Sequence, residues 1–331
     1  MNISILFDFI DGPWGGGNQF LKNLKKNLIK KKKYENNIFK TNALLINSHH
    51  KKYKLLFLKL FFKNKLLIHR IDGPLDYRSK EKNFQNENIK IINKYFADAT
   101  IFQSNWSQKE NDIKFTKFSD VIWNAPDSKL FSPKNNKSQS KKIKLISTCW
   151  STNISKGHNW YKFLDESLDF NKYEMSFIGR TLYNFKNIKV LPPLNSYDIA
   201  QHLKNSDIFV FCSKTEACSN SLLEALHTAL PIVYADGSSN NEIVRDNGIP
   251  FQNHNIIEKI RTVSDELDKY KLNFNNIYPD IDDVTDKYLL MFEKVKISVS
   301  KKLYIPKKIN LLIFFIILFN FLINDFKDKF K

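Results

Sequence analysis

The first 130 residues alternate between short apolar runs and segments with helical spacing. The helical spacing is clearest at Leu21, Leu24 and Leu28, which are separated by lysines and polar residues. Each apolar run ends in polar, Gly or Pro residues, as buried parallel strands do where they open into loops. The expected strands lie within residues 3–10, 63–74, 98–108 and 120–127, with a crossover helix over residues 86–99. We therefore predict an open α/β domain over residues 1–130.

Residues 132–142, SPKNNKSQSKK, are polar and contain no aromatic residue. We therefore interpret residues 131–142 as a linker. The strand and helix pattern then restarts and continues to residue 295. We expect a second parallel α/β domain over residues 143–295, closed by a helix over residues 282–295. Its expected strands lie within residues 143–150, 173–180, 187–194, 207–212 and 231–236.

The tail, residues 296–331, has a different pattern. Residues 309–323 are almost continuously apolar, but this run is shorter than the ~20 residues that a membrane-spanning helix needs. Lysines precede it at 307 and 308 and follow it at 327, 329 and 331. A core helix is one interpretation. A helix that is apolar on all sides would have little hydrophobic core left to pack into after two complete domains. We therefore favour an in-plane or partly inserted membrane anchor.

The composition is that of a globular protein, with 42% hydrophobic and 26% charged residues. The net charge of +18 comes from scattered lysines in a chain that is also rich in Asn, Ile and Phe, so we expect no specific nucleic-acid partner. The first ten residues lack a basic leader and a cleavage site, and they predict a strand and a cytoplasmic protein. The three cysteines, Cys149, Cys212 and Cys218, have neither disulfide nor zinc spacing. Residues 280–283, DIDD, predict an acidic helix start, so we expect no catalytic metal and no cofactor.

The segment SKTEACSNSLLEAL, residues 213–226, follows a predicted strand and begins a predicted helix. Ser221 and Glu224 have the spacing of a capping box, which leaves Glu216 unexplained. Alternatively, exposed amides at this helix start bind a phosphate, and a carboxylate one turn further on accepts hydrogen bonds from ribose hydroxyls. The segment alone does not decide between these two interpretations.

The two glutamates form an E-x7-E pair, and other motifs accompany it in order. Paired glycines follow the first strand, LIHRIDGP and IFQSNWS come next, and VIWNAPDSKLFSP precedes the linker. Lys156-Gly157 and the residues FIG at 177–179 follow expected strands of the second domain. Residues 3–295 thus resemble GT-B glycosyltransferases, in particular glycosyltransferase family 4. The resemblance implies an α/β GT-B fold, with two Rossmann-like parallel-sheet domains facing each other across a cleft.

The resemblance also implies roles for individual residues. Glu224 would hold the ribose of a nucleotide-diphosphate-sugar donor, and Lys156 would place a cation beside the departing diphosphate. Glu216 would hold the hydroxyls of the transferred sugar. The remaining donor-binding residues implied are Gly16, Gly17, Ala217, Cys218, Ser219, Asn220, Ser221 and Leu222, the last three through their amides to the diphosphate.

Three positions leave alternatives open. Ser151 stands near where the family has an arginine, and Arg180 is either its substitute or a surface residue. His69 matches a family histidine near the reacting sugar, or it is a satisfied loop histidine. Asp72 is either a base for the acceptor hydroxyl or a turn residue beside Gly73 and Pro74.

The sequence therefore predicts a membrane-associated, metal-independent glycosyltransferase at the inner face of a membrane. It would transfer a sugar to a glycan or lipid-linked saccharide in surface polysaccharide synthesis, and the resemblance to family 4 implies retention of configuration. One alternative is a degenerate GT-B protein that binds a nucleotide sugar or glycan without turnover. A basic nucleic-acid-binding protein is the other, and the scattered lysines argue against it.

Overall fold

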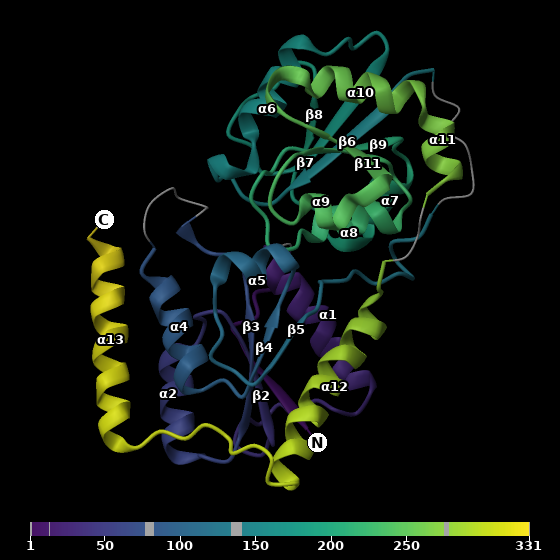
Figure 1. Ribbon diagram of the computed structural model, residues 1–331. Helices are drawn as coiled ribbons and strands as arrows, with labels where there is room; N and C mark the ends of the chain where they lie inside the picture. Colours follow the sequence, from purple (N-terminus) through teal and green to yellow (C-terminus); the bar gives the residue numbers. More distant parts are fainter. Residues whose placement is uncertain (1, 13, 77–82, 134–140, 275–277, 331) are drawn as a thin grey trace. The chain divides into compact units, whose positions relative to one another are not determined.

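The computed structural model describes residues 2–12, 14–76, 83–133, 141–274 and 278–330 (Figure 1). The chain divides into two compact units. Unit 1 comprises residues 1–9, 21–123 and 282–331, and unit 2 comprises residues 10–20 and 124–281. Most of the linker predicted over residues 131–142 lies outside the described residues.

Unit 1 contains a five-stranded parallel sheet in the order β1-β2-β3-β4-β5. Its central strand β3 is buried at all six positions, because helices cover both faces of such a sheet. The strands are β1 Ile3–Leu6, β2 Ala43–Asn47, β3 Leu66–Ile71, β4 Ala99–Phe102 and β5 Phe118–Val121, and the helices are α1 Gly16–Lys30, α2 Lys52–Phe61, α4 Gln85–Tyr95, α5 Asn105–Asn111, α12 Ile281–Ser300 and α13 Leu311–Lys329.

Unit 2 contains a six-stranded parallel sheet in the order β11-β10-β9-β6-β7-β8. The strands are β6 Ile143–Cys149, β7 Tyr173–Gly179, β8 Lys189–Leu191, β9 Ile208–Phe211, β10 Ile232–Ala235 and β11 Gly248–Phe251. The helices are α6 His158–Ser167, α7 Ser196–Lys204, α8 Asn220–His227, α9 Asn240–Val244, α10 Ile256–Asp265 and α11 Leu267–Leu272, with short 3₁₀ turns at Ile154–Lys156, Arg245–Asn247 and Asn253–Asn255. The α/β class with two parallel-sheet units is as the sequence predicted.

The end of the chain differs from the sequence-based expectation. We expected the helix over 282–295 to close the second domain, but residues 282–331 group with unit 1. The reason is local packing: α12 buries Val284, Tyr288 and Phe292, and its Asp286 forms an ion pair at 2.8 Å with Lys31, which directly follows α1.

The tail also packs into the hydrophobic core more extensively than we expected. Helix α13, yellow in Figure 1, lies along α2 and α4 of unit 1. Phe314, Ile317 and Phe321 belong to the same buried cluster as Leu55 and Ile92 of those helices. One face of the apolar run is therefore a core face, and the expectation that little core was left was wrong.

Candidate donor site

The strand order of unit 2 indicates at which edge of its sheet a ligand would bind. The chain leaves β6 toward β7 and β8 on one side, and β9 returns to pair with β6 on the other side. In open α/β sheets, ligands bind at the carboxyl ends of the strands at such a switch point. The segments that follow β6 and β9 contain Lys156 and Glu216, which the sequence analysis had selected.

Two glycines let the strand ends approach closely. Gly157 has φ +75°, and a Cβ at this position would lie 2.1 Å from the carbonyl oxygen of Cys212 at the end of β9. Gly179 has φ +128°, and its Cβ would lie 1.9 Å from the carbonyl oxygen of Cys149 at the end of β6. Any other residue would force the backbone apart, so both glycines are required for the packing of this edge.

Lys156 and Glu216 form an ion pair at this edge, between Nζ and Oε1. Ser213 Oγ donates to the same carboxylate oxygen at 2.6 Å, and the Glu216 amide donates to Ser238 Oγ at 2.9 Å. The Glu216 side chain is 14% exposed and the Lys156 side chain 26% exposed. The pair is thus held in place and partly exposed, with a cation and a carboxylate side by side.

The start of α8 resolves the capping question raised by the sequence. Ser219, not Ser221, is the N-cap, and its side chain accepts a hydrogen bond from the Leu222 amide at 3.4 Å. That amide is used inside the protein and the Leu222 side chain is fully buried, so neither is directed at a ligand. Ser221 and Glu224 instead line a cavity, and the capping-box interpretation of this pair was wrong.

Glu224 is the carboxylate most strongly affected by its surroundings at this site. Burial raises its pKa from 4.5 to about 8. It forms no hydrogen bond or ion pair with any side chain or backbone group in the part of the chain that the structure describes. Hydrogen bonds from the hydroxyl groups of a ligand would stabilise a desolvated carboxylate of this kind.

The cavity beside α8 has a volume of about 100 Å³. Gly16 lines it, and the Asn220 amide nitrogen donates to the Gly16 carbonyl oxygen at 2.8 Å. Gly17 does not line it. The residues lining the cavity are Trp14, Gly15, Gly16, Gln19, Thr148, Cys149, Trp150, Ile178, Gly179, Pro193, Leu194, Ser196, Ile199, Asn220, Ser221 and Glu224.

Ala217 and Cys218 are buried in the loop between β9 and α8. Asn124 secures this loop by donating to the Cys218 carbonyl oxygen at 3.0 Å and to Asn220 Oδ1 at 2.9 Å. Asn124 belongs to the VIWNAPD motif, but the sequence analysis gave it no role of its own. Its position in that motif was the available signal.

Arg180 directly follows Gly179 at the carboxyl end of β7, next to β6, as the sequence predicted. Its guanidinium carbon lies 4.2 Å from the centroid of the Trp150 ring and 5.9 Å from that of Trp14. Such cation–π contacts fix a guanidinium beside the cavity-lining tryptophans. Trp150 is a second residue that the sequence analysis missed, because an apolar run ending in Trp is ordinary for a strand.

The two remaining candidates, His69 and Asp72, belong to unit 1. His69 is completely buried in β3, where Nε2 lies 2.9 Å from the Ser48 carbonyl oxygen and Nδ1 lies 3.2 Å from Asn93 Nδ2. Burial lowers the pKa of His69 to about 4, so the ring is neutral at pH 7. These contacts give His69 a structural role in the sheet and favour the satisfied-histidine interpretation.

Asp72 follows β3 and is held by several donors. Arg70 Nη1 donates to it at 3.0 Å, Asn47 Nδ2 donates at 3.2 Å, and Gln103 also donates to its carboxylate. The Asp72 side chain is 20% exposed. A carboxylate held by three side-chain donors is engaged within the protein, which favours a structural role over that of a base.

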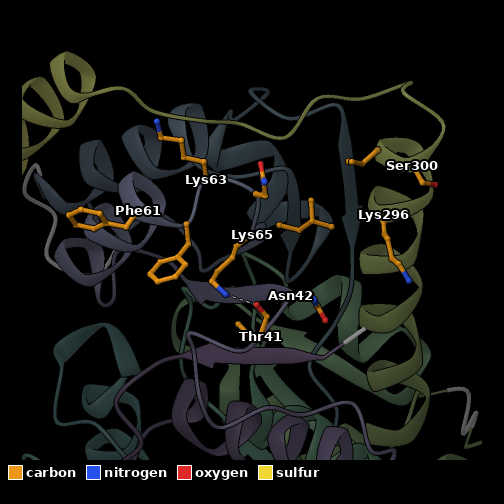
Figure 2. Close-up of a pocket in the computed structure, with 11 residues that line it drawn as sticks. Thr41, Asn42, Phe61, Lys63, Lys65, Lys296 and Ser300 are labelled. Carbon is orange, nitrogen blue, oxygen red and sulfur yellow. Dashed lines mark hydrogen bonds between the residues drawn. The ribbon is translucent and has the colours of Figure 1, made fainter.

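Unit 1 has a larger cavity, of about 840 Å³, at the other edge of its sheet (Figure 2). Thr41 and Asn42 precede β2, and Lys65 precedes β3, so the cavity lies at the amino ends of these strands. Lys65 donates to the carbonyl oxygens of Phe39, at 2.9 Å, and Thr41. This cavity is therefore at the edge that open α/β sheets do not use for ligands.

Within the described ranges, no group of three or more His, Cys, Asp and Glu side chains is arranged to hold a metal ion. Asp282 and Asp283 lie in the first turn of α12, as expected for an acidic helix start. Among the helices that the structure describes, none combines the length and the apolarity needed to cross a membrane.

Comparisons with known proteins agree with this geometry. Residues 173–266 match the family model of the glycosyl transferases group 1, a segment that contains Glu216 and Glu224. A search of curated proteins found no match.

Solved structures with the same fold include two that cover almost the whole chain. Sucrose-phosphate synthase from Thermosynechococcus elongatus is 10% identical with a TM-score of 0.66, covering 91% of this chain and 98% of that one. Anabaena Alr3699/HepE in complex with UDP-glucose is 13% identical with a TM-score of 0.66, covering 90% and 99%. A glycosyltransferase from Rickettsia africae is 13% identical with a TM-score of 0.57, covering 88% and 84%. The chain thus has the GT-B fold of these solved structures, and its residues 173–266 match the family model of the glycosyl transferases group 1.

Proposed function

We propose that the protein transfers a sugar, with retention of configuration, from a nucleotide-diphosphate-sugar donor to a hydroxyl group of a glycan or lipid-linked saccharide. The product would belong to surface polysaccharide or lipopolysaccharide synthesis. The observation that carries the donor assignment is Glu224, a desolvated carboxylate without a partner among the described residues, one turn into α8 at the switch-point edge of unit 2. The Anabaena relative of the same fold was solved with UDP-glucose, which supports a nucleotide sugar as the donor class.

Each residue has a role that its surroundings support. Glu224 accepts hydrogen bonds from the ribose hydroxyls, and the amides of Asn220 and Ser221, at the free start of α8, interact with the diphosphate. Lys156 neutralises the charge that develops on the diphosphate as the glycosidic bond breaks. Glu216 holds the hydroxyls of the transferred sugar with the backbone of Ala217–Ser219.

Retention needs no enzymic nucleophile in this proposal. The acceptor oxygen bonds to the anomeric carbon on the face from which the diphosphate departs, and the departing diphosphate oxygen takes the proton of the acceptor hydroxyl. Catalysis then consists of positioning and electrostatic stabilisation. This agrees with the structural roles of His69 and Asp72. Arg180 supplies a second cation near the cavity, while Ser151 is used in a turn, where its hydroxyl accepts from the Asn153 amide at 3.1 Å.

We expect the reaction to require neither a metal ion nor a cofactor. We also propose that the protein is cytoplasmic and contacts the inner face of a membrane through residues 309–323. No specific nucleic-acid partner is part of the proposal.

A thermal-shift screen tests the donor assignment. UDP, GDP, CMP and their sugar conjugates are added to the protein, to Glu224→Ala and to Glu166→Ala, whose glutamate is 61% exposed on α6. Binding raises the unfolding temperature by mass action. We expect one nucleotide class to raise it in the wild type and in Glu166→Ala but not in Glu224→Ala. No shift with any nucleotide would contradict the assignment.

A second candidate function is binding of the nucleotide sugar without turnover. It is motivated by Ser151, which stands in place of the arginine expected from the family resemblance and is occupied in a turn. Incubating the protein with the donor identified in the screen and measuring free sugar or transferred sugar distinguishes the two. Slow donor hydrolysis or transfer, absent in Lys156→Ala, would exclude this candidate.

A further inference from the structure

Helix α13 has two faces with different environments. On the inner face, Phe314, Ile317 and Phe321 are at most 5% exposed and pack against α2 and α4. The Phe314 ring lies 5.2 Å from that of Phe57 on α2, and Asn324 Nδ2 donates to Asn88 Oδ1 of α4 at 2.9 Å. The helix is therefore fixed lengthwise to unit 1.

The outer face of α13 is a continuous apolar stripe, and its side chains remain exposed with respect to the residues that the structure describes. Its residues recur at intervals of three and four positions, which places them on one side of the helix. Seven large side chains that are 50–70% exposed form this face: Leu311, Leu312, Phe315, Ile316, Phe319, Leu322 and Phe326. Together they expose on the order of 700 Å² of apolar surface, above the several hundred Å² usual for the largest patch of a soluble monomer.

The acidic side chains of α13 are directed away from this outer face. Asp325 accepts hydrogen bonds from Lys52, from Tyr53 Oη at 2.7 Å and from Gln85 Nε2 at 2.9 Å. Asp328 accepts from the Phe84 amide at 2.9 Å. Both carboxylates are thus hydrogen-bonded to residues of α2, α4 and the residue before α4, and not exposed on the outer face.

Exposed basic residues lie on the helices that pack against α13 and at its two ends. Lys54 on α2 and Lys90 and Lys94 on α4 are exposed on the helices that flank α13, and Lys308, Lys327 and Lys329 lie at its two ends. Glu87, also on α4, is paired with Lys90 at 3.3 Å. The apolar outer face is thus accompanied by six exposed lysines, on the adjoining helices and at the ends of α13.

We propose, resting on the membrane contact in the proposed function, that the outer face of α13 docks onto a bilayer that contains anionic phospholipid, with the helix parallel to the membrane plane. Its apolar side chains enter the boundary between headgroups and acyl chains, and the surrounding lysines contact the anionic headgroups. A helix of 19 residues presents a contact about 28 Å long. Because its inner face is core, the helix stays against unit 1 while it binds lipid.

The charge pattern distinguishes this occupant from a second copy of the chain. Two copies meeting through this face would bring two sets of lysines together without matching carboxylates, because Asp325 and Asp328 point inward. Like charges at such an interface oppose association. An anionic lipid surface complements the apolar centre and the basic surroundings together.

Flotation with vesicles tests the proposal. The full chain is mixed with vesicles of phosphatidylcholine alone or with added phosphatidylglycerol, and the bound fraction is measured after centrifugation. The double variant Phe315→Glu/Phe319→Glu alters the outer face, and Leu290→Glu is the matched control on α12, where the replaced side chain is 67% exposed. These exposed positions leave the core intact, which thermal unfolding of each variant verifies.

We expect the wild type and Leu290→Glu to float with the phosphatidylglycerol vesicles, and to do so less with phosphatidylcholine alone or at high salt. The double variant should bind at least about tenfold more weakly. Failure of the wild type to float, or equal flotation of the double variant, would overturn the proposal. A dimer that the double variant abolishes, without lipid binding, would assign the face to a second copy instead. The nucleotide-induced thermal shift should be the same in all three proteins, which separates this result from the donor assignment.

Discussion

Replacing Glu224 by glutamine should change how the stability of the protein depends on pH. The pKa of this carboxyl rises from 4.5 to about 8 on folding because of burial. The folded protein therefore holds the proton more tightly than the unfolded chain. Stability from this group is present below about pH 4.5 and is lost as the pH rises through 8, where the buried carboxylate becomes charged.

The magnitude follows from the size of that rise. At about 1.4 kcal/mol per pH unit, a rise from 4.5 to about 8 corresponds to about 5 kcal/mol as an upper limit. Glu224 lines a cavity that solvent reaches, so we expect about 2–3 kcal/mol. Glu224→Gln removes the charge and should be more stable than the wild type by this amount at pH 9, with little difference at pH 4.

Urea denaturation at pH 4, 7 and 9 measures this difference. Glu166→Gln is the control, because its carboxylate is exposed on α6 and should leave the pH dependence unchanged. If Glu224→Gln and the wild type lose stability in parallel between pH 4 and pH 9, Glu224 is solvated and the reasoning that assigns it to the ribose fails.

Three further predictions concern the same edge of unit 2. Gly157→Ala places a Cβ against the Cys212 carbonyl oxygen at a positive φ, so unit 2 should lose about 2–4 kcal/mol, measured by urea denaturation; an unchanged midpoint would contradict the close approach. Lys156→Ala should lower the turnover number about 10²-fold while retaining a nucleotide-induced thermal shift, and an equal loss of both would make Lys156 a binding residue only. Burial raises the pKa of the Cys149 thiol to about 11 and that of Cys212 further, so neither should react with iodoacetamide at pH 8 until urea unfolds the chain, and rapid labelling of the folded protein would refute this.

Much of the donor side could be predicted from the sequence because its signals are local. An apolar run followed by small polar residues and two glutamates specifies a strand, a loop and a helix start, and the structure has β9 and α8 at these positions. The parallel strand order then brings Lys156 to Glu216. The identity of the cap was less accessible, since Ser219 and Ser221 are both suitable and the path of the loop decides between them.

Features that depend on distant segments were missed. The core face of α13 has helical spacing at Phe314, Ile317 and Phe321, but apolar residues on the opposite face conceal that spacing in the sequence. β3 is buried on both faces, so no alternation indicated that His69 points into the protein. β2 and α2 were not among the expected elements, although α2 is one of the two helices on which α13 packs.

The composition of unit 1 has a consequence for the order in which the protein forms. Residues 10–20 and 124–281 form unit 2, whereas unit 1 needs residues 282–331 as well as residues 1–9 and 21–123. During synthesis, the segments of unit 2 are all present before α12 and α13 leave the ribosome, because chains emerge from the N-terminus. Until then Leu55 and Ile92 lack the partners that α13 provides, and the apolar surfaces of α2 and α4 stay open. The unit whose sequence begins first is thus completed last, and a ribosome that stalls before residue 311 holds a chain that a chaperone for exposed apolar surface would bind.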